Sequence, residues 1–239
     1  NLKPQMTVDY ELGFQQMLNI RSSIKFSAYY KEMRNQIQVY RFTGAHPMSY
    51  ISYNNIDFGT VKGMTISYDL RRNVNIWIKA NYTLQFADGT GSSATSGINL
   101  VRTGQPNLRI INPLDYDRRH NFSLVVDYRY GKGKNYNGPV ITRKVAGSDK
   151  LKTYPILQNT GVNFTFIGGS GVPYSRSSTV VPTQIGGGTY VLQGSMNGSR
   201  LPWQFTINAR LDKEISIAHG ADKKKTTDFN VYLEVMNVL

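Results

Sequence analysis

Eight segments with strictly alternating apolar and polar residues constrain the fold more than any other feature of this sequence. These segments are 8–15, 24–31, 63–70, 74–86, 121–130, 161–167, 203–212 and 229–236. In the first of them, Tyr10 and Leu12 lie on the face opposite to Glu11. A period of two is typical of β-strands with one apolar face. Since no segment shows convincing helical periodicity, we expect an all-β, antiparallel fold of about eight strands.

Alternation alone leaves two folds open, because a soluble β-sandwich also has strands with one apolar face. Strand length and aromatic content favour a transmembrane β-barrel. Segment 74–86 exceeds the roughly 9 to 11 residues that a tilted membrane strand needs. Tyr10, Phe86, Tyr128 and Trp203 lie near the ends of apolar faces. Aromatic girdles of barrels occupy such positions.

The connections between these segments also differ in length, as they do in outer-membrane barrels. Short links at 18–22 and 71–73 alternate with long ones at 34–59, 88–117 and 168–200. Periplasmic turns of such barrels are short and extracellular loops are long. The connection 131–158 breaks this rule, because it would be periplasmic yet is long and rich in lysine.

The sequence carries a net charge of +13 and contains no cysteine. The lack of cysteine excludes disulfides and thiol catalysis. No stretch of 18 apolar residues predicts a transmembrane helix, and no signal peptide is recognisable. Most of the positive excess lies in connections assigned to the periplasmic side, where it would face anionic lipid headgroups. Because this charge is spread over several turns, we expect no nucleic-acid partner.

Six sequence motifs in order resemble the C-terminal barrel portion of TonB-dependent outer-membrane transporters. They are LKPQMTVDYELGF (2–14), NIDFGTVKGMTISYDL (55–70), DYDRRHNFSL (115–124), SGVPYS (170–175), LPWQFTINARLDKEI (201–215) and VYLEVMNVL (231–239). Each motif alone is weak, but together they cover nearly the whole chain. The resemblance implies a bacterial outer-membrane location and a barrel of about 22 strands with a plugged lumen. Residues 1–239 would then form a partial barrel domain, without the plug, the earlier strands and the closing strand.

The resemblance also implies energised uptake of a nutrient such as a siderophore, an oligosaccharide or a peptide. The expected partners are outer-membrane lipid, the rest of the barrel with its plug, and a TonB-type inner-membrane complex that acts through the plug; a surface lipoprotein is a further candidate. The alternative is a barrel that serves as a scaffold or receptor subunit of a larger surface complex. An autonomous eight-stranded barrel is disfavoured by the missing closing segment and by long connections of 26 to 33 residues.

Neither catalysis nor a cofactor is expected from the residues. His46, His120 and His219 fall in separate connections or strand edges, and His120 is interpreted as a rim residue of the barrel. Asp115 and Asp117 could form a metal-binding pair. More often such a pair caps a turn or pairs with neighbouring arginines, here Arg118 and Arg119. The Gly-Lys-Gly-Lys run 131–134 lacks the frame of a phosphate-binding loop.

Ligand-binding residues are expected in the extracellular loops and the upper lumen. There aromatic rings can stack on sugars or flat ligands, and arginine can bind carboxylate or phosphate. The candidates are Tyr40, Arg41, Tyr50, Tyr53, Arg102, Tyr174, Arg176 and Tyr190. The alternative for each is an ordinary loop residue that packs against neighbouring loops.

Overall fold

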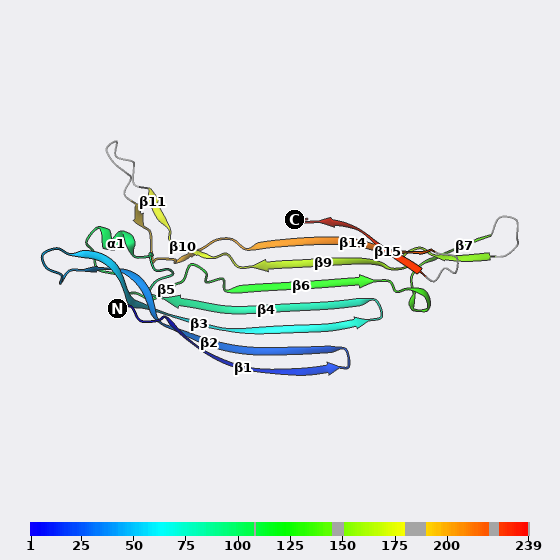
Figure 1. Cartoon of the computed structure of the whole chain (residues 1–239), viewed down its shortest axis with the longest axis horizontal. Coiled ribbons are helices and arrows are strands. Elements are labelled where there is room, and N and C mark those ends of the chain that lie inside the picture. The colour runs from blue at the N-terminus through cyan, green and yellow to red at the C-terminus, as the bar shows by residue number, and fades with distance from the viewer. Residues whose placement is uncertain (108, 145–150, 180–189, 220–224, 239) are drawn as a thin grey trace.

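The computed structural model describes residues 1–107, 109–144, 151–179, 190–219 and 225–238. It contains one main antiparallel sheet whose long strands follow each other in chain order (Figure 1). These strands are β1 (Met6–Asn19), β2 (Ser22–Phe42), β3 (Tyr50–Asn73), β4 (Ile76–Gly89), β6 (His120–Arg129), β9 (Thr160–Gly169), β14 (Gln204–His219) and β15 (Lys225–Val235). All eight expected strands are therefore confirmed, and their simple order matches the wall of an up-and-down barrel.

The register of the sheet keeps the apolar residues of neighbouring strands on one face. One row across the sheet pairs Tyr68 with Ala80, Ala80 with Leu124, and Leu124 with Phe166. A slip of one residue would move every side chain to the other face, so the apolar pattern fixes the register. This apolar face is uncovered at both edges of the sheet, where Leu12 is 80% and Leu233 64% exposed. A second sheet would cover such a face in a β-sandwich, and within the described residues none does.

Connections of different length meet at the two ends of the sheet. The turns 20–21 and 74–75 define its short-turn end, and the connections 43–49, 90–119 and 170–203 define its long-loop end. The connection 130–159 also lies at the short-turn end (Figure 1). It contains the 3-10 helix η1 (Gly133–Asn135) and a hairpin of β7 (Val140–Lys144) and β8 (Leu151–Pro155).

The expectation of a long connection over 34–59 is wrong, because most of this segment is strand. β2 and β3 contain 21 and 24 residues and pair up to Phe42 and Tyr50. An irregularity between Met33 and Gln36 interrupts their ladder, and Asn35 has a positive φ of 56° there. Such a bulge shifts the phase of the alternation, which hides the rest of the strand from a periodic pattern.

The expectation of a chain without helices also needs correction. The loop after β4 forms the short strand β5 (Asn112–Pro113), which pairs with β4, and the five-residue helix α1 (Ile98–Arg102). The long-loop end also contains the small sheets β10 (Pro173–Tyr174) with β13 (Ser199–Arg200) and β11 (Ser177–Thr179) with β12 (Tyr190–Leu192). In the part of the chain that the structure describes, no helix is long and apolar enough to cross a membrane.

The loop 90–119 folds back over the polar face of the sheet at the long-loop end. It buries Leu114 against Val61 and Ala87, and Tyr29 and Met33 pack on this small cluster. The described chain thus has its largest hydrophobic cluster on the polar face, under this loop. The main apolar face, by contrast, faces outward.

Aromatic side chains lie on the apolar face near both ends of the strands. At the long-loop end the ring of His120 stacks between Tyr82 and Trp203, and its Nδ1 lies 2.9 Å from the Tyr82 hydroxyl. At the short-turn end Tyr128 contacts Tyr130 edge to face. His120 therefore lies at the rim, as expected, within a belt of aromatic residues of the kind found at membrane interfaces.

Candidate functional site

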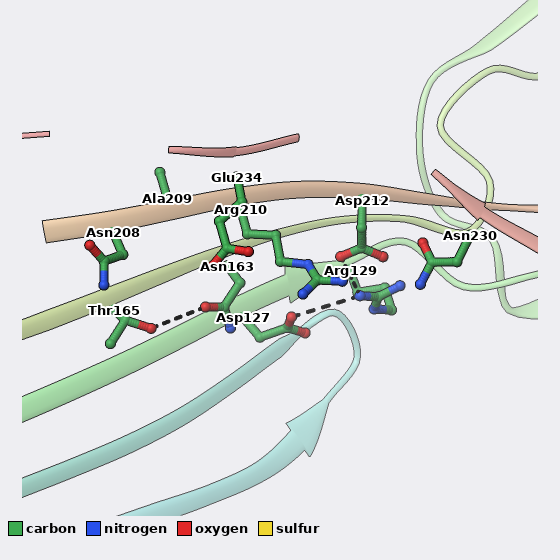
Figure 2. A pocket seen from close by; sticks show the side chains of 10 residues that line it. All are labelled: Asp127, Arg129, Asn163, Thr165, Asn208, Ala209, Arg210, Asp212, Asn230 and Glu234. Atoms are coloured by element: carbon green, nitrogen blue, oxygen red, sulfur yellow. Dashed lines mark hydrogen bonds and ion pairs between the residues drawn. The ribbon is translucent and has the colours of Figure 1, made fainter. Parts of the chain in front are cut away.

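Two pockets of more than about 300 Å³ lie on the polar face of the sheet. The first, here called the lower pocket, has a volume of about 390 Å³ and lies over β6, β9, β14 and β15 towards the short-turn end (Figure 2). Polar and charged side chains from alternate strand positions point into it, among them Asn163, Thr165, Arg210 and Glu234. The alternation that exposes apolar residues outside thus also builds this polar surface.

Two buried carboxylates of the lower pocket are neutralised by arginines. An Nη atom of Arg129 lies 2.7 Å from Asp212 and 4.0 Å from Asp127. Arg72 also forms an ion pair with Asp127. Hydrogen-bonded ion pairs of this kind compensate the cost of burying a charge. The four charged residues therefore form a continuous chain from β3 across β6 to β14.

Gly161 makes this chain of ion pairs possible. β6 and β14 are not neighbours, because β9 lies between them, and Gly161 of β9 is paired with both Arg129 and Asp212. A Cβ atom at this position would lie 2.6 Å from the Arg129 guanidinium group. The missing side chain therefore leaves the path by which Arg129 crosses β9 to reach Asp212.

The second pocket, here called the upper cavity, lies between the loop 90–119 and the polar face at the long-loop end. Its volume is about 340 Å³, and its lining is rich in glycine, serine and asparagine. The loop is held to β2 by hydrogen bonds from the Val39 N–H to the Ala94 carbonyl and from the Asn107 amide to the Val39 carbonyl. Pockets of 300 Å³ and above are typical of small-ligand sites.

A buried carboxylate and a buried amide form the floor of the upper cavity. Asp57 is 6% and Gln38 2% exposed, and the Gln38 Nε2 donates to the Asp57 carboxylate at 2.9 Å. The Thr90 hydroxyl donates to the second oxygen of Asp57 at 3.0 Å. Gln38 also donates to the Ser96 hydroxyl at 2.6 Å, so β2, β3 and the loop meet at this point.

Seven of the eight predicted ligand-binding residues have described side chains, and none of these seven lines the upper cavity. Arg41 instead donates to the backbone carbonyl of Val101 at 3.1 Å and to that of Arg102 at 3.4 Å, and so ties β2 to the end of α1. Tyr40 and Tyr50 both contact the ring of Phe42 within the β2–β3 hairpin.

The other predicted residues lie at the same end of the molecule but are not brought together. Tyr53 and Tyr174 are exposed, and Arg102 and Arg176 lie in exposed loop positions. Tyr190 begins β12, and its side chain lies outside the described residues. The role of these eight residues in ligand binding therefore stays a prediction.

Sequence reasoning missed Gln38, Asp57 and the small residues around them. Gln38 and Asp57 lie in the segment that was interpreted as a connection. The run GTGSSATSG (89–97) was part of another connection, although it supplies much of the lining. An unusual cluster of glycine and serine is the one signal that could have marked this loop as a site of close backbone approach.

Asp117 does not behave as half of a metal site. Its carboxylate is 1% exposed, forms an ion pair with Arg200, and lies 3.6 Å from Arg119. It also accepts a hydrogen bond from the Ala87 N–H at 2.9 Å. Pairing with Arg119 is thus confirmed. Arg118 instead donates to Gln204 at 3.2 Å. Among the described residues, no group of three histidine or acidic side chains could hold a metal ion.

The sequence matches the family model described as TonB dependent receptor-like, beta-barrel, over residues 1–238. The chain belongs to this family of β-barrels. The structure is similar to that of the outer membrane transporter YddB from Escherichia coli, with a TM-score of 0.55 and 13% sequence identity. That similarity covers 100% of this chain but 29% of the transporter. No curated protein matches the sequence.

Membership of this receptor family assigns the faces and ends of the sheet. The protein is an outer-membrane β-barrel protein of bacteria. Its apolar outer face contacts lipid, and its polar face, with both pockets, faces the lumen. The long-loop end is the extracellular one, since loops of such barrels are long on that side. The upper cavity therefore lies at the external entrance of the lumen.

Proposed function

We propose that this chain forms part of the wall of a receptor that takes up a nutrient across the outer membrane, with energy supplied through TonB. The upper cavity is the observation that carries this proposal. It opens on the lumen side of the extracellular end, where a ligand entering the barrel would first meet polar groups held in fixed positions.

The transport step would use binding and release without covalent chemistry. A plug in the same polypeptide would close the lumen, and a TonB-type complex in the inner membrane would act on that plug. The exposed aromatic residues of the β2–β3 hairpin, including Tyr50 and Tyr53, would contact the ligand before it reaches the cavity. The ion pairs of the lower pocket would hold the wall rigid while the plug moves.

Nutrient depletion from the medium tests this proposal directly. Three strains would be grown separately: one with the full-length gene, one without it, and one in which the gene is restored. A parallel culture of each strain would be treated with a protonophore, and the components of every medium would be measured by mass spectrometry. We expect at least one component to be depleted only in strains that carry the gene and only while the proton gradient is intact.

Two results would contradict the proposal in different ways. Depletion that continues after the gradient collapses would remove energised transport and leave passive entry. No difference between strains, together with stable copurification of other surface proteins, would favour the alternative role as a scaffold or receptor subunit of a larger complex.

A further inference from the structure

The upper cavity contains a buried acidic side chain and no cationic one. Asp57 and Asp115 line it, whereas no lysine, arginine or histidine is among its described lining residues. A smaller cavity of about 220 Å³ on the other side of the segment 91–94 is also lined by Asp57 and again by no cationic side chain. This lining is unusual in a chain with a net charge of +13.

Asp57 differs in this respect from the other buried acidic residues that the structure describes. Those residues are Asp117, Asp127 and Asp212, and each forms an ion pair with at least one arginine. Among the residues that the structure describes, those that donate hydrogen bonds to Asp57 do so through neutral groups, the amide of Gln38 and the hydroxyl of Thr90. An ionised carboxylate can accept about four hydrogen bonds, so part of its capacity is unused.

Two arginines at this end of the molecule donate hydrogen bonds to backbone carbonyls. Arg41 donates to the carbonyl of Val101, and Arg109 donates to the carbonyl of Ile56 at 3.2 Å. Neither residue lines the upper cavity. A buried carboxylate without a cation is costly, and a positive charge supplied from outside would remove that cost.

The carboxylate is also held in a fixed position before any ligand arrives. Gln38, which donates to Asp57, donates as well to the Ser93 carbonyl at 3.1 Å and accepts from the Gly97 N–H at 3.3 Å. The loop backbone approaches so closely that a Cβ atom at Gly91 would lie 2.1 Å from the Asp57 carboxylate. A group fixed in this way binds its partner without a large loss of conformational freedom.

We propose that the upper cavity binds its ligand through a cationic, ammonium-type group placed against Asp57. The serine and asparagine side chains of the lining take the ligand's remaining hydrogen bonds, and anionic ligands are excluded by repulsion from Asp57 and Asp115. This assignment rests on the proposed uptake function and adds to it the charge of the ligand.

Thiol labelling measures the charge preference of the cavity without knowledge of the ligand. The described chain has no cysteine, so Ser93→Cys places a single thiol in the lining of both cavities. The full-length receptor in outer-membrane vesicles, with any cysteine outside these residues replaced by serine, would react with two methanethiosulfonates. One carries a trimethylammonium group and the other a sulfonate.

The measured quantity is the ratio of the cationic to the anionic labelling rate. We expect Asp57→Asn to lower this ratio at least about fivefold, the effect of one charge at about 4 Å even with the screening of water. Asp115→Asn should lower it less, because Asp115 is exposed. As a matched control, Thr165→Cys in the ion-paired lower pocket should give the same ratio with and without Asp57→Asn.

An unchanged ratio in the Asp57→Asn receptor overturns the inference, and so does a cavity that neither reagent can enter. If Asp57→Asn prevents insertion into the membrane, the Asp115→Asn receptor is measured instead. A labelling ratio that does not fall in that receptor would then overturn the inference. Labelling needs no transport. If the cavity is charge-selective but no nutrient is depleted, only the proposed function is contradicted. If depletion is normal but the labelling ratio is unchanged, only this inference is contradicted.

Discussion

The lower pocket and the upper cavity use the same kind of residue in opposite ways. In the lower pocket, Asp127 and Asp212 are buried beside Arg72 and Arg129, and their charges are compensated within the protein. In the upper cavity, Asp57 is similarly buried, and its partners in the described part of the chain are neutral. The first arrangement stabilises the wall, while the second leaves a charge to be compensated by something else.

A glycine supports each arrangement. Gly161 opens the path for the Arg129 side chain, and Gly91 lets the loop backbone cover Asp57. In both cases the missing Cβ atom permits a close approach, but one approach joins opposite charges and the other shields a single charge. Whether a buried carboxylate is compensated by a cation therefore depends on which group occupies the space beside the neighbouring glycine.

Both pockets face the lumen only if the apolar face of the sheet contacts lipid. A charged residue placed on that apolar face tests this assignment and should cause the largest loss of stability. Leu124 lies in the middle of β6 and pairs with Ala80 and Phe166. Leu124→Arg should lower the free energy of unfolding by about 2 to 4 kcal/mol if the residue lies near the middle of the bilayer. Urea unfolding in lipid vesicles measures the loss. The control is Ser123→Arg on the lumen face, and equal losses for both variants would refute the assignment.

The second largest loss of stability is expected when an arginine of the lower pocket is replaced. Removing one partner of a fully buried ion pair costs about 3 to 5 kcal/mol. The side chain of Arg129 is 32% exposed, so we expect a smaller loss of about 2 kcal/mol for Arg129→Met. The same unfolding measurement applies. Asp212→Asn in the same protein should recover part of the loss, and no recovery would mean that packing, rather than charge, explains it.

A methyl group at Gly91 should disturb the cover of the upper cavity. Overpacking of this kind costs about 1 kcal/mol or slightly more where a loop can yield. Gly91→Ala should therefore reduce stability by about that amount and change the labelling rate at Ser93→Cys. Gly44→Ala is the matched control, since a Cβ atom there meets nothing within 4 Å. Similar values for both variants would show that the loop does not lie closely over Asp57.

The smallest effect on stability is expected for Asp57→Asn. This substitution removes the cost of a buried charge that has no cation beside it, but it also weakens the hydrogen bonds from Gln38 and Thr90. Because these two effects oppose each other, we expect the free energy of unfolding to change by at most about 0.5 kcal/mol. A loss as large as that of Arg129→Met would mean that Asp57 is compensated within the barrel. In that case the two regions would not differ.

The existence of the strands and the face of each residue could be predicted from the sequence, because both depend on a local pattern. Alternation places each residue on a face, and a register that is wrong by one residue would turn the apolar residues of a strand to the polar face. The extension of β2 and β3 could not be predicted, since the bulge at Asn35 shifts the phase of the alternation. α1 was missed because its five residues are too few to show a helical period.

The upper cavity could not be predicted because it depends on contacts between residues that are far apart in the chain. Ser96 lies 58 residues from Gln38, with which it shares a hydrogen bond. Arg41 was interpreted as a ligand contact from its chemistry and its expected place in an extracellular loop. It also donates to carbonyl groups at the end of α1, a helix that the sequence did not indicate.

The unusual length of the β2–β3 hairpin has a consequence for ligand capture. Of the 21 residues of β2, about 11 suffice to cross the bilayer, and the remaining 10 extend about 33 Å at 3.3 Å each. With a tilt of about 45°, the tip stands roughly 23 Å beyond the hydrocarbon region. That height is nearly three times the Debye length of about 8 Å in physiological salt. A molecule arriving at the tip therefore senses the hairpin's own charges, with those of the lipid surface largely screened.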